Sequence, residues 1–395
     1  MRATKITCLA VISLLAISLG RPAAAQQPRA ESLILFIGDG MGPEIVTIAK
    51  MYSEQVLEAE LSMVALANTG VTGLVTTHSA DRLVTDSAAG ATALATGVKT
   101  GNGVVGMTID GARLENLFER AASQGKAVGV VTTTSVTDAT PASFLSHVRA
   151  RGYETDIAAQ IIEGKASVVM GGGLNYFLPA GDGKRADGRN LIEEARDKGF
   201  AVVLDRDALA AASGDRILGI FAPEDLPYEN ERRTYEVPSL AEMMTRALRV
   251  LTADPDGFVL VVEGGRIDHA EHEHNLPGAL AEILAFDAAI GSAMDYQRSD
   301  SALVLVVTAD HDTGGPGLTA GEAGYPKISD VSGLVNEGST LVKWLSEDHV
   351  GTMVPIFARG PGERLFSGIL DNTEVNRRAI TLLELEGVGA ATEQR

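Results

Sequence analysis

Basic residues are scarce in this chain. Its 33 lysines and arginines face 52 aspartates and glutamates, which gives a formal net charge of −19 at pH 7. Non-specific binding to nucleic acid depends on positive charge that neutralises phosphates, so no nucleic-acid partner is expected. A phosphate-bearing substrate would need local positive charge, supplied by metal ions or by an arginine.

Cysteine and repetitive sequence are also lacking. The chain has one cysteine, Cys8, and we find no internal repeats, heptads, low-complexity tracts or linker rich in proline and serine. The composition, with 45% hydrophobic and 22% charged residues, is that of a globular protein with a large core. Stability must then come from the core, from bound metals or from subunit contacts, without disulfides.

The first 25 residues have the pattern of a secretory signal peptide. Arg2 and Lys5 precede an apolar run from Cys8 to Leu19, and small residues follow at 23–25. The run is short for a membrane span, although a retained anchor is the alternative. We expect a signal peptide at 1–25, a folded domain at 26–395, no stable membrane anchor after cleavage, and a periplasmic or secreted location. Cleavage would leave 30 basic residues against 52 acidic ones, a net charge of −22.

From residue 31 onward, short β-branched runs alternate with longer amphipathic ones, the rhythm of an α/β fold. The apolar segments 33–37, 258–262 and 303–307 predict strands buried on both faces, as in a parallel sheet. Candidate site residues extend from Asp39 to His349, so no division into independent domains keeps them together. We predict a single large α/β domain with a mostly parallel central sheet, helices on both faces and a site at the carboxyl edge of the sheet.

Ser87 begins a run of small residues that predicts a helix from this point. The first turn of such a helix points backbone N–H groups and its positive dipole end at the Ser87 hydroxyl, where a phosphoryl group could sit. The alternative is that Asp86 or Ser87 only caps the helix.

Acidic residues and histidines follow several of the predicted strands. Asp39 lies in a glycine-rich turn after the strand at 33–37, where an ordinary Asp-Gly turn is the alternative. Asp268 and His272 are four residues apart, so a helix that starts near residue 267 places both on one face, as is common for two metal ligands. Pairs with this spacing also occur on solvated helices.

Two further segments follow predicted strands. Asp310 and His311 are adjacent in a loop whose glycines permit the bend that brings both side chains onto one ion. His349 is isolated, and a lone histidine usually belongs to the surface or the core.

A helix is also predicted after the strand at 127–133. Thr140 suits its cap and Pro141 its first turn, and the same helix would carry His147 and Arg151. Arg151 offers a planar fork that matches two phosphate oxygens, although it could be a plain surface arginine.

These side chains together suit zinc for the sites that contain nitrogen and magnesium for an oxygen-rich one. Carboxylates, histidines and an activated serine form the inventory of a polymetallic hydrolase.

Six motifs, in this order, resemble the alkaline phosphatase family and span nearly the whole chain after residue 25. They are I-G-D-G-M at 37–41, T-D-S-A-A-G-A-T-A at 85–93, D-A-T-P at 138–141 with His147 and Arg151 following, V-E-G-G-R-I-D-H-A-E-H at 262–272, T-A-D-H-D-T-G-G at 308–315, and H-V-G-T-M-V-P-I-F-A-R-G-P at 349–361. The resemblance implies that residues 26–395 form the family's catalytic domain. It also implies hydrolysis of phosphate monoesters to an alcohol and inorganic phosphate through a phosphoserine intermediate, in a homodimer.

The resemblance also implies a role for each site residue. Ser87, beside Asp86, would be the nucleophile, and Arg151 would bind the phosphate oxygens. Two zinc ions would be present, one held by Asp268, His272 and His349 and the other by Asp39, Asp310 and His311. One magnesium ion would be held by Asp39, Thr140 and Glu263, with Asp138 acting through water and His269 nearby.

Three features depart from familiar members of that family. No cysteine follows residue 25, so the disulfides of the enteric bacterial enzyme are absent. The stretch between His311 and His349 is too short for the large insertion of the mammalian enzymes. Asp138 matches the enteric pattern, whereas His269 matches the mammalian one.

Two other functions remain open. A phosphodiesterase or sulfatase of the same superfamily would typically place threonine or a modified cysteine at the nucleophile position and lack the ligands of the third metal. A non-catalytic periplasmic protein that binds phosphate or metal is the alternative from another class, but a pure binder needs no activated serine.

Overall fold

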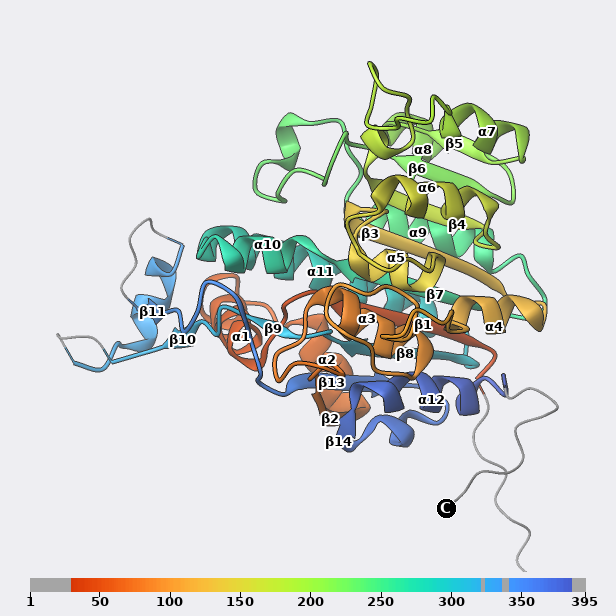
Figure 1. Cartoon of the computed structure of the whole chain (residues 1–395). Helices are drawn as coiled ribbons and strands as arrows, with labels where there is room; N and C mark the ends of the chain where they lie inside the picture. Colours follow the sequence, from red (N-terminus) through yellow and green to blue (C-terminus); the bar gives the residue numbers. More distant parts are fainter. Residues whose placement is uncertain (1–29, 321–323, 336–340, 386–395) are drawn as a thin grey trace, which may run out of the picture.

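One ten-stranded sheet runs through the molecule in the order β14-β2-β13-β8-β1-β7-β3-β4-β6-β5 (Figure 1). The computed structural model describes residues 30–320, 324–335 and 341–385. Neighbouring strands of this sheet are parallel except for β13, which is antiparallel to both β8 and β2. The strands are β1 (Ser32–Gly38), β2 (Val71–Thr76), β3 (Ala127–Ser135), β4 (Val168–Gly172), β5 (Ala201–Val203), β6 (Ile217–Ile220), β7 (Phe258–Gly264), β8 (Leu303–Thr308), β13 (Val354–Arg359) and β14 (Gly368–Asp371).

The central strands are apolar because both of their faces are covered. Every residue of β1, β7 and β8 is buried, as the continuous hydrophobic runs at these positions predict. Each buried leucine, isoleucine or valine side chain contributes about 1.5–3 kcal/mol relative to exposure. The predicted α/β fold with a mostly parallel sheet is therefore confirmed.

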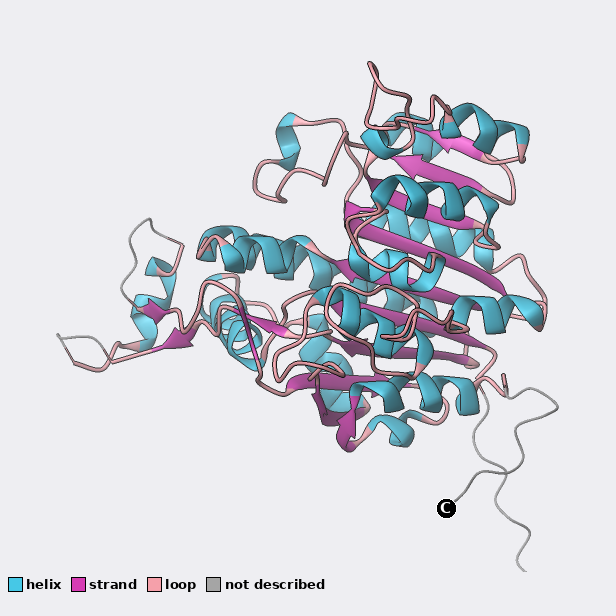
Figure 2. Cartoon of the chain, viewed as in Figure 1, coloured by secondary structure: helices cyan, strands magenta, loops and turns pink. Residues whose placement is uncertain are grey.

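Helices lie on both faces of the sheet (Figures 1 and 2). The helices of one set pack against one another around α3 and α5. They are α3 (Ser87–Thr96), α4 (Leu117–Ser123), α5 (Ala139–Leu145), α6 (Glu154–Glu163), α7 (Leu191–Asp197) and α12 (Asn372–Leu382). The helices of the other set pack around α9 and α11. They are α1 (Pro43–Val56), α2 (Ser62–Thr69), α8 (Arg206–Ala211), α9 (Leu240–Leu251), α10 (Arg266–His272) and α11 (Leu276–Gln297).

Short elements complete the described chain. Two small antiparallel pairs, β9 (Asp312–Thr313) with β12 (His349–Val350) and β10 (Gly317–Leu318) with β11 (Val342–Lys343), lie apart from the main sheet. The 3-10 turns are η1 (Leu174–Tyr176), η2 (Arg232–Thr234), η3 (Ile328–Gly333) and η4 (Glu363–Phe366).

α11 is the only helix in the described ranges that is long and apolar enough to cross a membrane. Its most apolar window is 61% buried inside the molecule, as expected for the core helix of a globular domain. The predicted signal peptide, residues 1–25, lies outside the described residues.

One predicted helix is shorter than the sequence suggested. α5 ends at Leu145, so His147 and Arg151 lie in the segment that follows it rather than on the helix. The chain leaves the helix there because Val148 pairs with Val105 in an antiparallel bridge. The imidazole of His147 also lies 2.7 Å from the backbone oxygen of Gly106.

Candidate active site

α3 begins at Ser87, and all but the last of its residues are buried. The preceding residue, Asp86, caps the helix, because its carboxylate accepts a hydrogen bond from the backbone N–H of Ala89 at 3.0 Å. The small residues of α3 let it lie against the loop after β8. A Cβ added to Gly90 would come within 2.9 Å of the backbone oxygen of Asp310. Capping thus falls to Asp86, and the Ser87 hydroxyl remains free to face the site.

The Ser87 hydroxyl lies between a histidine and an arginine. Its Oγ is 3.2 Å from Nε2 of His311 and 3.4 Å from Nη1 of Arg151. The other terminal nitrogen of Arg151 donates to Oδ1 of Asp138 at 2.9 Å, and Nη1 lies 3.7 Å from Oδ2 of Asp86. The Arg151 side chain is 35% exposed. The two carboxylates therefore hold the guanidinium beside Ser87 while solvent still reaches it.

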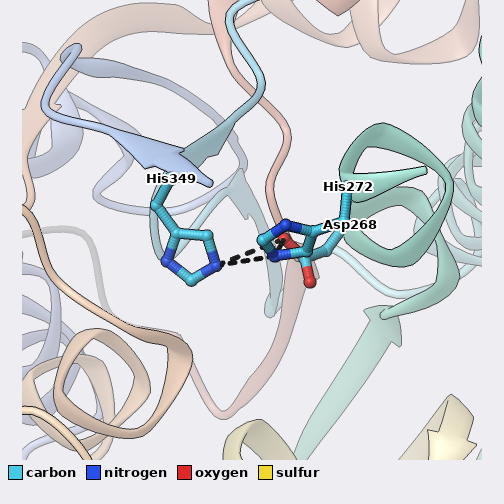
Figure 3. Close-up of side chains that lie close together, drawn as sticks. All are labelled: Asp268, His272 and His349. Carbon is cyan, nitrogen blue, oxygen red and sulfur yellow. Dashed lines mark hydrogen bonds and ion pairs between the residues drawn. The ribbon is translucent and has the colours of Figure 1, made fainter. Parts of the chain in front are cut away.

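Asp268, His272 and His349 form one group of facing side chains (Figure 3). Nε2 of His272 is 3.1 Å from Nε2 of His349, and these nitrogens lie 3.4 and 3.6 Å from Oδ1 of Asp268. α10 supplies Asp268 and His272, four residues apart on one face as predicted. His349 arrives from β12, which pairs with β9 so that His349 lies opposite Thr313.

Backbone carbonyls orient both of these imidazoles. Nδ1 of His272 lies 2.7 Å from the Glu347 oxygen, and Nδ1 of His349 lies 2.8 Å from the Thr85 oxygen. A carbonyl can only accept, so each Nδ1 carries the proton and each Nε2 presents a lone pair. Two lone pairs 3.1 Å apart, beside a carboxylate, repel one another unless a cation lies among them. This orientation is typical of histidines that bind metal through Nε2.

His311 presents its Nε2 in the same way. Thr313 donates its hydroxyl hydrogen to Oδ1 of Asp268 at 2.5 Å, so towards Nδ1 of His311, 3.2 Å away, it must accept. Nε2 of His311 then points a lone pair at Oδ1 of Asp39 and Oδ2 of Asp310, each 3.3 Å away. Both of these oxygens are buried and accept no hydrogen bond from a described residue. Asp39, Asp268 and His311 also form a compact group of potential metal ligands.

A third group contains oxygen alone. Oδ2 of Asp138, Oγ1 of Thr140 and Oε1 of Glu263 are buried and make no hydrogen bond of ordinary geometry with a described residue, although Thr140 lies close enough to lower the pKa of Glu263. The other carboxylate oxygen of Glu263 accepts a short hydrogen bond from the Thr132 hydroxyl. His269 lies beside this group, and its Nδ1 accepts a hydrogen bond of 2.8 Å from Arg266.

The crowding of these groups is visible in their pKa values. Burial, followed by repulsion from Asp310 and Asp268, raises the pKa of Asp39 well above its usual range. Burial, with repulsion from Asp138, raises the pKa of Glu263 to about 8. Burial, with repulsion from Asp268, raises the pKa of Asp310 to about 8. Burial and the nearby His349 and Arg151 lower the pKa of His311. A cation among these side chains would relieve the repulsion and restore the ionised carboxylates.

Asp138 differs from its acidic neighbours. Burial alone would raise its pKa, but Arg151 and His269 outweigh burial and lower the pKa. Asp138 is therefore an anion that holds Arg151 in place.

The structure brings together every predicted site residue, and it adds several that the sequence did not single out. Thr313 links Asp268 to His311, and the Glu347 and Thr85 carbonyls fix the two other histidines. Thr313 lies within the motif at 308–315, and a hydroxyl two residues from His311 could have been predicted to orient that histidine. The two carbonyls carry no side-chain signal, so only the fold identifies them.

The fold and these groups define a hydrolase of the α/β type, with metal-binding side chains gathered around a serine. The family model of alkaline phosphatase matches residues 30–329. The chain therefore belongs to the alkaline phosphatase family, and it is a phosphomonoesterase.

Three similar proteins illustrate the range of this family. The chain is 36% identical to streptomycin-6-phosphate phosphatase from Streptomyces griseus, over 88% of this chain and 89% of that protein. It is 39% identical to the repressible alkaline phosphatase of Saccharomyces cerevisiae, over 72% of this chain but only 55% of the yeast enzyme. A structure of alkaline phosphatase from the Antarctic bacterium TAB5 matches with a TM-score of 0.79 and 29% identity, over 92% of this chain and 100% of that one. That TAB5 protein is a variant in which aspartate replaces a histidine, with Mg bound in its M3 site.

We expect zinc to stabilise the fold through the two histidine-containing groups. Adding Zn²⁺ to EDTA-treated protein should raise the free energy of unfolding by about 3 kcal/mol for each of the two sites at a hundredfold excess over the dissociation constant, because the ions bind only the folded sites. His349→Ala should reduce this gain, measured by chemical denaturation with and without Zn²⁺. His78→Ala, at an exposed histidine outside the site, is the control and should keep the full gain. An equal gain in both variants would show that His349 binds no zinc.

Proposed function

We propose that the protein hydrolyses phosphate monoesters through a phosphoserine formed on Ser87, at a site that holds two zinc ions and one magnesium ion. The observation that carries this proposal is the position of the Ser87 hydroxyl. It lies between Arg151 and His311 and borders groups of unpaired ligand atoms.

The side chains fit these metals by their donor atoms. Asp268, His272 and His349 supply oxygen and nitrogen to one zinc ion, and Asp39, Asp310 and His311 supply them to the other. Asp39, Thr140 and Glu263, with Asp138 through water, supply oxygen alone, which suits magnesium. Magnesium in the TAB5 variant supports a magnesium ion in this fold.

When bound, the zinc ions would polarise the phosphoryl oxygens and lower the pKa values of the serine hydroxyl and of water. Ser87 would then attack phosphorus through its Oγ, and the alcohol would leave from the opposite side. Arg151 would donate to two phosphoryl oxygens through its planar fork, held in place by Asp138 and Asp86. The backbone N–H groups at the start of α3 would add partial positive charge at the same oxygens. Water would then hydrolyse the phosphoserine and release inorganic phosphate.

The proposal includes two properties that the described residues do not address. The pattern of residues 1–25 supports export to the periplasm or the medium. A homodimer rests on the family resemblance alone. The proposed partners are small phosphate esters. After cleavage of the signal peptide, we expect no stable membrane anchor.

The first test replaces Ser87 by alanine. Turnover of a chromogenic phosphate monoester should fall by on the order of a hundredfold or more, while hydrolysis by water at the metal ions leaves a residue of activity. Acid quenching should trap phosphate on the wild-type chain and none on Ser87→Ala. Ser143→Ala, which also removes a buried hydroxyl, is the matched control and should behave as wild type. A protein that only binds phosphate would release no alcohol at all, and wild-type turnover in Ser87→Ala would rule out the assigned nucleophile.

The second test concerns Arg151. Arg151→Ala should weaken inhibition by inorganic phosphate by about 1.5–3 kcal/mol, the value of hydrogen bonds to a charged group. Arg151→Lys keeps the charge without the planar fork and should give an intermediate inhibition constant. Unchanged phosphate inhibition in Arg151→Ala would mean that this side chain does not contact the substrate.

The third test concerns Asp138 and His269. Added magnesium should raise the activity of zinc-loaded protein, because the third group contains oxygen alone. Lysine keeps its positive charge in alkaline buffer, so His269→Lys should tighten phosphate inhibition about tenfold, roughly 1.5 kcal/mol, and lower kcat by slowing product release. The neutral variant His269→Gln separates charge from shape and should not tighten inhibition. An enzyme indifferent to magnesium, or a lysine variant with weaker phosphate inhibition, would contradict the respective half of this prediction.

A further inference from the structure

A loop between α3 and α4 runs beside the segment that carries Arg151. Val105 and Val148 form an antiparallel bridge with two backbone hydrogen bonds, of 3.0 and 3.1 Å. Further along the segment, the backbone N–H of Arg151 donates to the Gly103 oxygen at 2.8 Å. The backbone N–H of Gly103 donates in turn to Oδ2 of Asp86 at 2.9 Å, and this oxygen lies 3.7 Å from the Arg151 guanidinium. The loop therefore ties the backbone of Arg151 to one of the carboxylates that hold its side chain.

His147 fastens the other end of this pairing. Its Nδ1 lies 2.7 Å from the backbone oxygen of Gly106 and donates to it, because a carbonyl only accepts. The approach is close enough to require a glycine. A Cβ added to Gly106 would come within 2.8 Å of Nδ1 and 2.4 Å of the Ser146 oxygen, and its φ of +62° also favours glycine. The imidazole thus fixes the loop to the segment one residue from the Val105–Val148 bridge.

A second contact fixes the imidazole itself. Nε2 of His147 lies 3.0 Å from Oε1 of Glu119, which belongs to the first turn of α4. Oε2 of Glu119 accepts a hydrogen bond of 3.1 Å from the Asn116 backbone in the capping box of that helix. Burial alone would raise the pKa of Glu119, but the hydrogen bonds from His147 and Asn116 outweigh burial and lower the pKa. The His147 side chain is only 8% exposed, so it has little freedom to turn.

Both ring nitrogens of His147 are thus engaged, and the ring offers no free atom to a substrate or a metal ion. Any influence on the reaction must pass through the backbone. The Arg151 side chain is long and 35% exposed, so two directed hydrogen bonds to a phosphate depend on a fixed starting point for the chain.

We propose that His147 is a positioning residue for phosphate binding. It fixes the loop that holds the backbone of Arg151, and it thereby sets where the guanidinium meets the phosphoryl oxygens. The inference rests on the role proposed above for Arg151 in binding the substrate.

The test is a double-mutant cycle read out by inorganic phosphate. His147→Ala should raise both KM and the inhibition constant of phosphate by on the order of tenfold, because the guanidinium is no longer held in place. kcat should change by less than about twofold, because Ser87 and the metal ligands keep their positions. In an Arg151→Ala background, His147→Ala should change the inhibition constant by less than about twofold, because no guanidinium remains to be misplaced.

Conservative variants separate the two contacts of the ring. His147→Asn places an amide nitrogen near the position of Nδ1, so it should keep the contact with Gly106 and restore inhibition close to that of the wild type. His147→Gln reaches towards Glu119 instead and should behave like His147→Ala. Ser146→Ala removes a buried hydrogen bond of 2.9 Å to the Ala142 oxygen from the neighbouring residue, and this matched control should keep wild-type inhibition.

Two outcomes would overturn the proposal while leaving the role of Arg151 intact. One is wild-type inhibition in His147→Ala when Arg151→Ala alone weakens it. The other is an equally large effect of His147→Ala in both backgrounds, since that effect would not pass through Arg151. Unchanged inhibition in Arg151→Ala would instead refute the proposed contact with phosphate, and this inference with it. If circular dichroism shows that His147→Ala does not fold, His147→Gln replaces it under the same criteria.

Discussion

Repulsion among buried carboxylates and histidine lone pairs is the constraint on which the site depends. Four adjacent strands of the sheet, β8, β1, β7 and β3, each deliver an acidic residue at or just beyond their carboxyl ends. The parallel register places Ile37 beside both Glu263 and Thr308, so Asp39, Glu263 and Asp310 must converge. Such a cluster is stable only if protons or cations offset its charge, and bound cations would also serve a phosphoryl-transfer reaction.

The hydrogen bonds of the site orient the potential metal ligands, and they leave the atoms that face the metal positions without a hydrogen-bond partner. The backbone carbonyls of Thr85 and Glu347 and the Thr313 hydroxyl each accept a hydrogen bond from the Nδ1–H of a histidine. Every Nε2 is thereby left facing the carboxylates. Arg151 is also held in place by neighbouring side chains, because Asp138 and Asp86 position its guanidinium beside Ser87. In a chain with a net charge of −19, the positive charge that a phosphate needs would come from Arg151 and from cations bound among these ligands.

The sequence was informative where local pattern and burial agree. β1, β7 and β8 were predictable because strands covered on both faces are apolar throughout, and the spacing of Asp268 and His272 already placed both on one helical face. The limits appear where distant segments meet. His349 looked like an isolated histidine, and only the pairing of β12 with β9 brings it to the site.

The predicted helix through Arg151 was wrong for the same physical reason. Val148 forms a β-bridge with Val105, 43 residues earlier in the chain, so α5 ends before it reaches Arg151. The capping question at α3 also needed the structure, since either Asp86 or Ser87 suited the cap by residue type. No local rule reports contacts of this kind, because they depend on segments far apart in the sequence.

Anomalous scattering from crystals of the zinc-loaded protein, collected on both sides of the zinc absorption edge, tests the central claim most directly. The account predicts one zinc peak bounded by Nε2 of His272 and Nε2 of His349, and a second bounded by Nε2 of His311 and the carboxylate of Asp39. It predicts no zinc peak at Thr140 and Glu263 when magnesium is present. The absence of zinc between His272 and His349, or zinc bound only at surface histidines, would contradict it.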